Sequence, residues 1–78
     1  MKSIEITENP GYKDRYILES KCYISNLLIN KINTKVKGVD SATRKGNYSL
    51  FITKAKLFEW WDVEKDLLFL LREEGLID

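Results

Sequence analysis

Apolar and polar residues alternate in two short stretches near the N-terminus, a pattern typical of strands that bury one face. Residues 3–7 form the first stretch and residues 15–20 the second. Between them, Asn9-Pro10-Gly11 places proline and glycine at the two central positions of a type II turn. The sequence therefore predicts a β-hairpin, in which Ile4 shares a face with Ile6, and Tyr16 shares a face with Leu18.

The following stretch, residues 20–30, favours a short helix. Ile24, Leu27 and Leu28 fit one helical face. Ser20 is an acceptable N-cap, because its hydroxyl can accept a hydrogen bond from the first helical turn.

A second hairpin is expected in the middle of the chain. Residues 31–37 alternate between charged or polar and apolar or β-branched side chains, which predicts a strand. Residues 38–46 are polar and predict a loop, and residues 48–53 alternate again. If the apolar sets share one face, the strands place Val36 near Tyr48 and Ile32 near Ile52.

Residues 59–74 give the clearest helical pattern. Large apolar residues recur there at helical spacing, and Gly75 suits a helix end. This stripe consists of Trp60, Val63, Leu67, Leu70 and Leu71. The element order is therefore ββαββα, an α+β fold in which helices cover one face of a small antiparallel sheet. Because the chain has no repeat or flexible linker, we expect residues 1–78 to form a single compact domain.

The last helix carries a second group of large side chains, roughly opposite the core stripe. The group consists of Phe58, Trp61, Leu68 and Phe69, framed by Lys65 and Arg72. Trp, Phe and Arg contribute strongly to protein interfaces. Two arrangements fit this pattern. Either the helix lies centrally and both sides are core, or the second side contacts another protein or a second copy of this chain.

Composition excludes several kinds of chemistry. The chain has no histidine, which removes the usual neutral-pH general base and the commonest transition-metal ligand. Its single cysteine, Cys22, forms neither an intramolecular disulfide nor a two-thiolate zinc site, and we expect this thiol to be buried and inert. No constellation of residues indicates catalysis, a cofactor or a metal. We therefore expect a protein that is not an enzyme.

The cellular location is predicted from two absences. The N-terminal residues contain no apolar stretch of signal-peptide length, and the longest apolar run, residues 67–71, is far shorter than the roughly 20 residues of a membrane span. We therefore expect a cytoplasmic protein that does not associate with a membrane.

Charge is distributed unevenly, although the net charge is only +1. Residues 31–56 hold seven Lys and Arg against one acidic residue, a net charge of +6. Residues 57–78 hold two basic against seven acidic residues, a net charge of −5. A basic hairpin with an exposed aromatic side chain is a feature of nucleic-acid-binding proteins. The residues concerned are Lys31, Lys35, Lys37, Arg44, Lys45 and Phe51. The alternative is an ordinary solvated hairpin face, neutralised by the acidic helix.

The sequence thus supports two functional hypotheses. The first is a small non-enzymatic protein–protein interaction module, such as an inhibitor, adaptor or regulator, that docks through its C-terminal helix onto another protein or forms a homodimer. The second is a nucleic-acid-binding protein that uses the basic hairpin of residues 31–56. Neither hypothesis involves a small-molecule substrate.

Overall fold

A four-stranded antiparallel sheet is the framework of the structure, a computed structural model that describes residues 4–77. The strands are β1 (Ile4–Glu8), β2 (Arg15–Ser20), β3 (Val39–Gly46) and β4 (Ser49–Lys54). Their order across the sheet is β1-β2-β4-β3. The sheet therefore has two edges, one formed by β1 and the other by β3.

The predicted N-terminal hairpin is confirmed. β1 pairs with β2 in a regular antiparallel register that includes Ile6 opposite Leu18. The N–H of Tyr12 donates to the carbonyl of Asn9 over 3.2 Å, and Gly11 has a φ of 83°. These are the features of a turn with proline and glycine at its centre.

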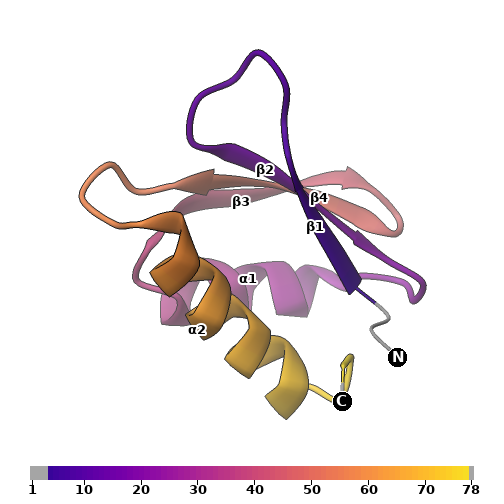
Figure 1. The fold of residues 1–78 in the computed structure, drawn as a ribbon. Helices are drawn as coiled ribbons and strands as arrows, with labels where there is room; N and C mark the ends of the chain where they lie inside the picture. Colours follow the sequence, from indigo (N-terminus) through magenta and orange to yellow (C-terminus); the bar gives the residue numbers. More distant parts are fainter. Residues whose placement is uncertain (1–3, 78) are drawn as a thin grey trace.

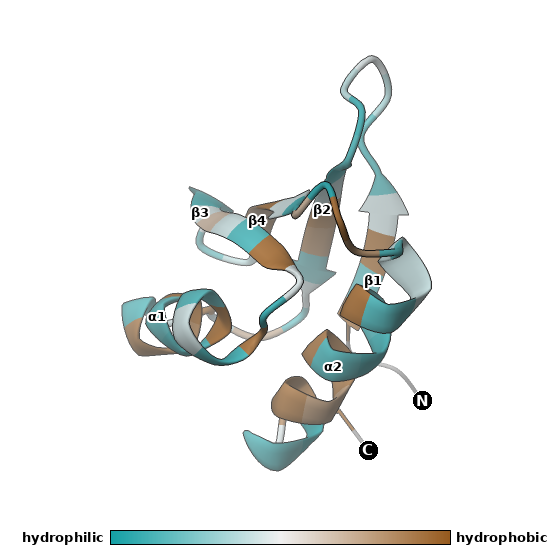
Figure 2. Ribbon diagram, turned by 90° about the vertical axis from the view of Figure 1, so that its left-hand side faces the viewer, coloured by the Kyte–Doolittle hydropathy of each residue, from teal (hydrophilic) through white to brown (hydrophobic). Residues whose placement is uncertain are grey.

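Two helices cover one face of this sheet (Figure 1). They are α1 (Asn26–Lys35) and α2 (Trp60–Glu73). The order ββαββα and the α+β class predicted from the sequence are therefore confirmed, and α2 lies within the predicted range of 59–74. Figure 2 shows α1 beneath the β3 side of the sheet and α2 beneath the β1 side.

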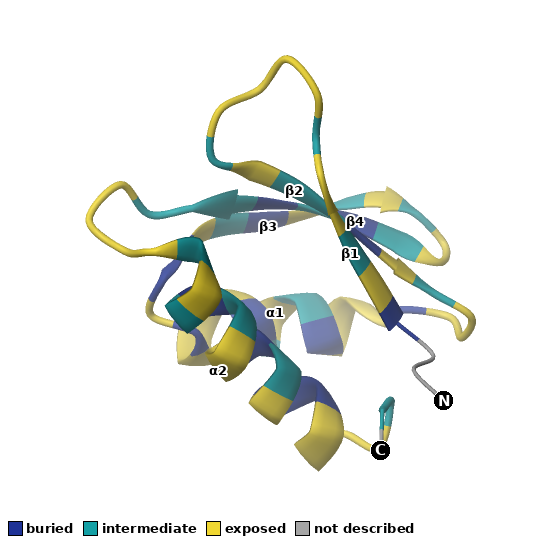
Figure 3. Ribbon diagram, in the orientation of Figure 1, coloured by how far each residue is buried: buried dark blue, intermediate teal, exposed yellow. Residues whose placement is uncertain are grey.

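The core fills the space between the sheet and the helices (Figure 3). Every element contributes to it, and no buried side chain in the described part of the chain is polar or charged. The fully buried residues with the largest side chains are Leu18, Ile24, Ile32, Leu50, Ile52, Leu67, Leu71 and Val63. Since the inner sides of both helices face this core, their other sides remain at the surface.

The prediction of a strand over residues 31–37 is wrong, because residues 26–35 form α1. The helix begins five residues later than expected, and Ser25 is its N-cap, with a side chain that accepts a hydrogen bond from Leu28 N at 3.2 Å. Ile24, Leu28, Ile32 and Val36 are all buried. Their spacing of four residues is a helical signal, and it outweighs the accidental alternation in residues 31–37.

The prediction of a loop over residues 38–46 is also wrong, because residues 39–46 form β3. This strand pairs with β4 and places Ala42, not Ile32, opposite Ile52. Its register shifts at two points, between Val39 and Ser41 and between Arg44 and Gly46. Such irregularities interrupt the alternation of side chains, so the strand has no regular hydrophobic pattern. The second hairpin therefore spans β3 and β4, and not residues 31–56.

Candidate interaction surface

Helix α2 turns one side to the core and the other to solvent. Its buried residues are Val63, Leu67, Leu70 and Leu71. Trp60 occupies the first helical position and stacks on Tyr16 of β2. These contacts fix the rotation of the helix about its axis, and they determine which side chains point outward.

Five of the six interface residues predicted from the sequence lie on this helix, and we call them the outer face of α2. They are Trp61, Lys65, Leu68, Phe69 and Arg72. Trp61 is 68% exposed and Phe69 is 60% exposed, and both cations are also at the surface. Leu68 differs, since it is half-buried and packs against the core. The outer face therefore combines two solvated aromatic rings with two cations around a partly anchored leucine.

The sixth predicted residue, Phe58, lies apart from this face. It precedes α2 and is 38% exposed, with its ring packed over Gly38. The neighbouring Leu57 is 98% exposed and was missed by the sequence analysis. Its position next to an aromatic residue just before a helix was the available signal. Both residues therefore belong to the connection between β4 and α2 and not to the outer face of α2.

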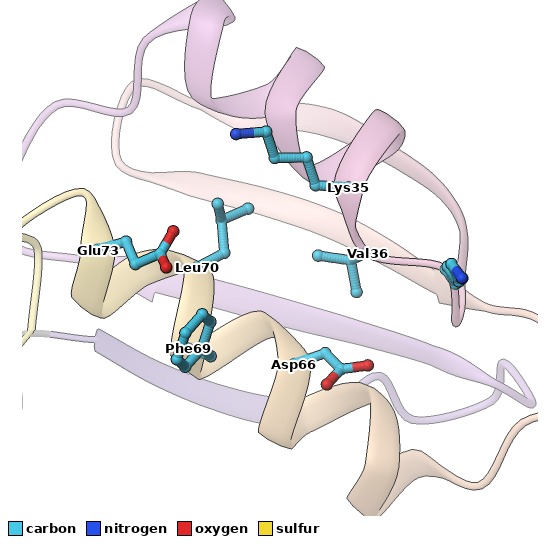
Figure 4. Close-up of a pocket in the computed structure, with 7 residues that line it drawn as sticks. Lys35, Val36, Asp66, Phe69, Leu70 and Glu73 are labelled. Carbon is cyan, nitrogen blue, oxygen red and sulfur yellow. The ribbon is translucent and has the colours of Figure 1, made fainter.

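Two shallow pockets lie beside the outer face. One has a volume of about 270 Å³ and is lined by Lys65, Asp66, Leu68, Phe69 and Arg72. The other, of about 400 Å³, lies between the end of α1 and α2 (Figure 4). Its lining residues are Lys35, Val36, Lys37, Asp66, Phe69, Leu70 and Glu73. Phe69 borders both pockets, so a side chain from a partner could contact this ring from either side.

The basic and acidic parts of the chain meet between the two helices. Lys31 on α1 forms an ion pair with Glu74, with the Lys31 Nζ and Glu74 Oε1 atoms 2.8 Å apart. Lys35 of α1 lines the same groove as Asp66 and Glu73 of α2. The positive middle of the sequence is thus partly neutralised within the fold.

The six residues proposed for nucleic-acid binding occupy four different places. Lys31 and Lys35 are on α1, and Lys37 follows that helix. Lys45 is exposed on β3, whereas Phe51 is half-buried on the sheet face away from the helices. These six side chains therefore do not share one hairpin face, because residues 31–56 do not form the predicted hairpin.

The last residue of that set, Arg44, has a structural role. Its guanidinium group donates to the carbonyl of Ile24 at 2.6 Å, to Asn26 Oδ1 at 2.9 Å and to the carbonyl of Gly46 at 3.0 Å. It also lies over the ring of Tyr23. These contacts hold the start of α1 against β3 and leave few donors for a phosphate.

Within residues 4–77, no group of three or more histidine, cysteine or acidic residues could hold a metal ion. The prediction that Cys22 is buried is wrong, because this thiol is exposed. Ser20 Oγ accepts a hydrogen bond from the Cys22 N–H at 3.0 Å, which places the residue in a tight turn after β2.

Among the helices of the described residues, none has the length and apolar character needed to cross a membrane. Comparison of the chain with protein-family models, with curated proteins and with solved structures gave no match.

Proposed function

We propose that this chain is a non-enzymatic protein-binding module that docks through the outer face of α2. It would act as an inhibitor, adaptor or regulator of the protein it binds. The observation that carries the proposal is the position of Trp61, which is 68% exposed on a helix whose opposite side already fills the core. The Trp61 ring is therefore not part of the hydrophobic core.

The residue types on this face suit protein recognition. Tryptophan and arginine are enriched among the residues that contribute most to binding energy. The rigid tryptophan ring buries a large area at a small entropic cost. Trp61 and Phe69 supply the apolar contact, and Lys65 and Arg72 supply cations at the rim. Cations at the edge of an interface orient a partner and accelerate association more than they strengthen it. We therefore expect acidic groups on the partner, facing Lys65 and Arg72.

We propose the cytoplasm as the compartment. Cys22 is a free, exposed thiol, and it is the only cysteine of the chain. Such a thiol suits a reducing environment, whereas small secreted domains are commonly held by several disulfides.

A photo-cross-linking residue tests the docking surface directly. The photoreactive amino acid p-benzoylphenylalanine replaces Trp61 in one variant and Tyr48 in a control, since Tyr48 is exposed to a similar degree in the turn between β3 and β4. In cells that express the chain, we expect light to give a discrete protein adduct from position 61 and not from position 48. Identical adducts from both positions, or none from position 61, would overturn the proposal.

Truncation of the same residue gives a quantitative test. Once the adduct identifies the bound protein, Trp61→Ala should weaken binding by about 2 kcal/mol or more, because central aromatic residues contribute that much to interfaces. Tyr48→Ala should leave the affinity unchanged. Since Trp61 contributes little to the core, the thermal unfolding temperature of both variants should remain close to that of the original chain.

A further inference from the structure

The two edges of the sheet are protected very differently. At the β3 edge, a side chain of α1 takes the place of a neighbouring strand. Asn33 Oδ1 accepts a hydrogen bond from Ala42 N at 2.8 Å, and Asn33 Nδ2 donates to Ala42 O at 2.9 Å. β3 is also irregular, with two register shifts. Bulges and covering groups of this kind prevent another strand from pairing with an edge.

The β1 edge has no comparable protection in residues 4–77. The N–H of Asn9 donates to the carbonyl of Arg15, which makes these two residues a hydrogen-bonded pair. Because such pairs alternate along an antiparallel ladder, the odd-numbered residues carry the hydrogen bonds between β1 and β2. The backbone groups of Ile4, Ile6 and Glu8 consequently point away from β2 into the open edge. The strand pairs without a register shift, and its five residues include no lysine or proline.

The open edge of β1 continues into the outer face of α2. A shallow pocket of about 190 Å³ lies between the two elements and is lined by Ile4, Glu5, Ile6, Glu64 and Leu68. Leu68 also lines the pocket beside Lys65 and Arg72. The free strand edge and the exposed helix face are therefore parts of one surface that meet at Leu68.

We infer that this surface binds a second copy of the same chain, with β1 pairing antiparallel to β1 of the second copy about a two-fold axis at Ile6. This inference rests on the proposed function, because it names the protein that the outer face of α2 contacts. Closed two-fold dimers are the commonest form of protein self-association. The pairing would join two four-stranded sheets into one continuous sheet and remove the open edge of both copies.

The number of paired residues and the avoidance of opposed glutamates select this register among those that backbone alternation allows. With the axis at Ile6, all five residues of β1 pair, and Glu5 lies opposite Thr7 of the second copy. An axis at Glu5 would place two glutamates directly opposite each other, which is unfavourable. An axis at Thr7 would pair only the end of the strand. The register at Ile6 therefore gives the most hydrogen bonds without opposing like charges.

The same symmetry covers the outer face of α2. A two-fold axis perpendicular to the sheet keeps both α2 helices on the same face, with their β1 sides toward each other. Trp61 exposes about 150 Å² of its surface, judged from the typical area of an aromatic side chain. A stable interface needs roughly 800 Å² from each partner. The helix aromatic alone is too small for this, and the adjoining strand edge and Leu68 supply further area.

Sedimentation equilibrium tests the dimer and its register with two variants of one exposed residue. The original chain should approach twice the monomer mass as its concentration rises. Thr7→Glu would bring two negative charges opposite each other in each of the two symmetric contacts, and should weaken the dimer roughly fivefold. Thr7→Lys would place an opposite charge beside Glu5 of the second copy and should strengthen the dimer by a similar factor. Weakening by both variants would overturn the register.

A proline substitution tests the strand edge itself. The N–H of Glu8 faces the open edge, so Glu8→Pro removes a donor that only the dimer uses. It should weaken the dimer roughly tenfold relative to the matched control Glu8→Ala, because symmetry removes the bond twice. Equal dimer affinities of these two variants would overturn pairing through β1.

The failure of this inference is distinguishable from failure of the proposed function. A chain that remains a monomer at every concentration, while its photoreactive residue at position 61 captures a different protein, would overturn the dimer and leave the docking surface of α2 in place. A dimer that responds to Thr7 and Glu8 substitutions, with no adduct from position 61, would support β1 pairing and overturn the role of α2.

Discussion

The indole ring of Trp60 stacks on the phenol ring of Tyr16, with ring centroids 3.6 Å apart and planes 9° from parallel. The indole Nε1–H of Trp60 also donates to Glu64 Oε2 at 3.1 Å, one turn later in α2. This contact joins the first residue of α2 to the middle of the sheet. Because consecutive helical residues point about 100° apart, holding Trp60 against the sheet turns the adjacent Trp61 into solvent.

We expect the two rings to be energetically coupled. The variants Tyr16→Leu and Trp60→Leu, together with the double variant, form a double-mutant cycle for the free energy of unfolding. Stacked aromatic pairs contribute about 0.5–1.5 kcal/mol beyond the area they bury. Urea denaturation of the four proteins should give a coupling energy in that range. Additive effects of the two substitutions would contradict the proposed role of the stack in holding α2.

The same tyrosine makes stability depend on pH in the alkaline range. Burial raises the pKa of Tyr16 above its ordinary value of 10.0, and the negative charges of Glu8, Asp14 and Glu64 raise this pKa further. The unfolded chain therefore releases this proton at a lower pH than the folded chain. The contribution is fully present below pH 10 and is lost as the pH rises from there through the pKa of the folded state.

Tyr16→Phe isolates this effect, since it keeps the aromatic ring and removes the ionisable hydroxyl. The free energy of unfolding of the original chain should fall as the pH rises past 10, and that of Tyr16→Phe should fall less steeply. Urea denaturation on both sides of pH 10 measures the two slopes. Parallel slopes would show that Tyr16 titrates alike in the folded and unfolded chains.

The accuracy of the sequence predictions followed the regularity of each element. Helix α2 was predicted almost to its ends, because Val63, Leu67 and Leu71 repeat a core stripe over its whole length. The N-terminal hairpin was predicted because its strands alternate and Pro10 with Gly11 marks the turn. In both cases the local pattern and the tertiary burial agree, so the sequence alone was sufficient.

The predictions for residues 31–46 are wrong because tertiary contacts outweigh the local pattern of this segment. Lysines along residues 31–35 argue against a helix, yet Lys31 reaches Glu74 at the C-terminal end of α2, a contact that a single sequence does not reveal. Strand β3 has only Val39 and Ala42 buried, and its irregular register hides the alternation. Its edge is completed by Asn33 from a different element. For the candidate site, the sequence predicted the residues of the outer face but not the degree of exposure of Leu68.

Loss of the Asn33 amide should destabilise the β3 edge. Asn33→Ala removes both partners of the Ala42 backbone, and we expect the free energy of unfolding to fall by about 1–3 kcal/mol. Asn33→Asp keeps an acceptor for the Ala42 N–H but faces the Ala42 carbonyl with an oxygen, so it should also destabilise. Hydrogen exchange at the Ala42 amide reports the contact directly, and its protection should decrease in both variants.

Asn30 provides the matched control for this test, because it is an exposed asparagine on the same helix. Asn30→Ala should change the free energy of unfolding by less than about 0.5 kcal/mol, as surface substitutions commonly do. Equal losses at positions 30 and 33 would contradict a specific role of the contact with Ala42, because the higher helix propensity of alanine would by itself stabilise both variants.

The close packing of α2 against the α1–β3 connection depends on the missing side chain of Gly38. A methyl group at this position would overlap Cγ2 of Val63 and lie 3.1 Å from Cδ2 of Phe58. Gly38→Ala should therefore lower the free energy of unfolding by about 1–3 kcal/mol, the usual effect of overpacking a core. At Gly46, the nearest atom to an added methyl group is the Ser49 hydroxyl oxygen at 3.3 Å, so Gly46→Ala is the milder control.

If the overlap is the cause, Gly38→Ala should cost clearly less in a Val63→Ala background, because truncation of the valine removes the atom it meets. Thermal or urea unfolding of the single and double variants measures this difference. An equal loss in both backgrounds would assign the effect of Gly38→Ala to the backbone and not to contact with α2.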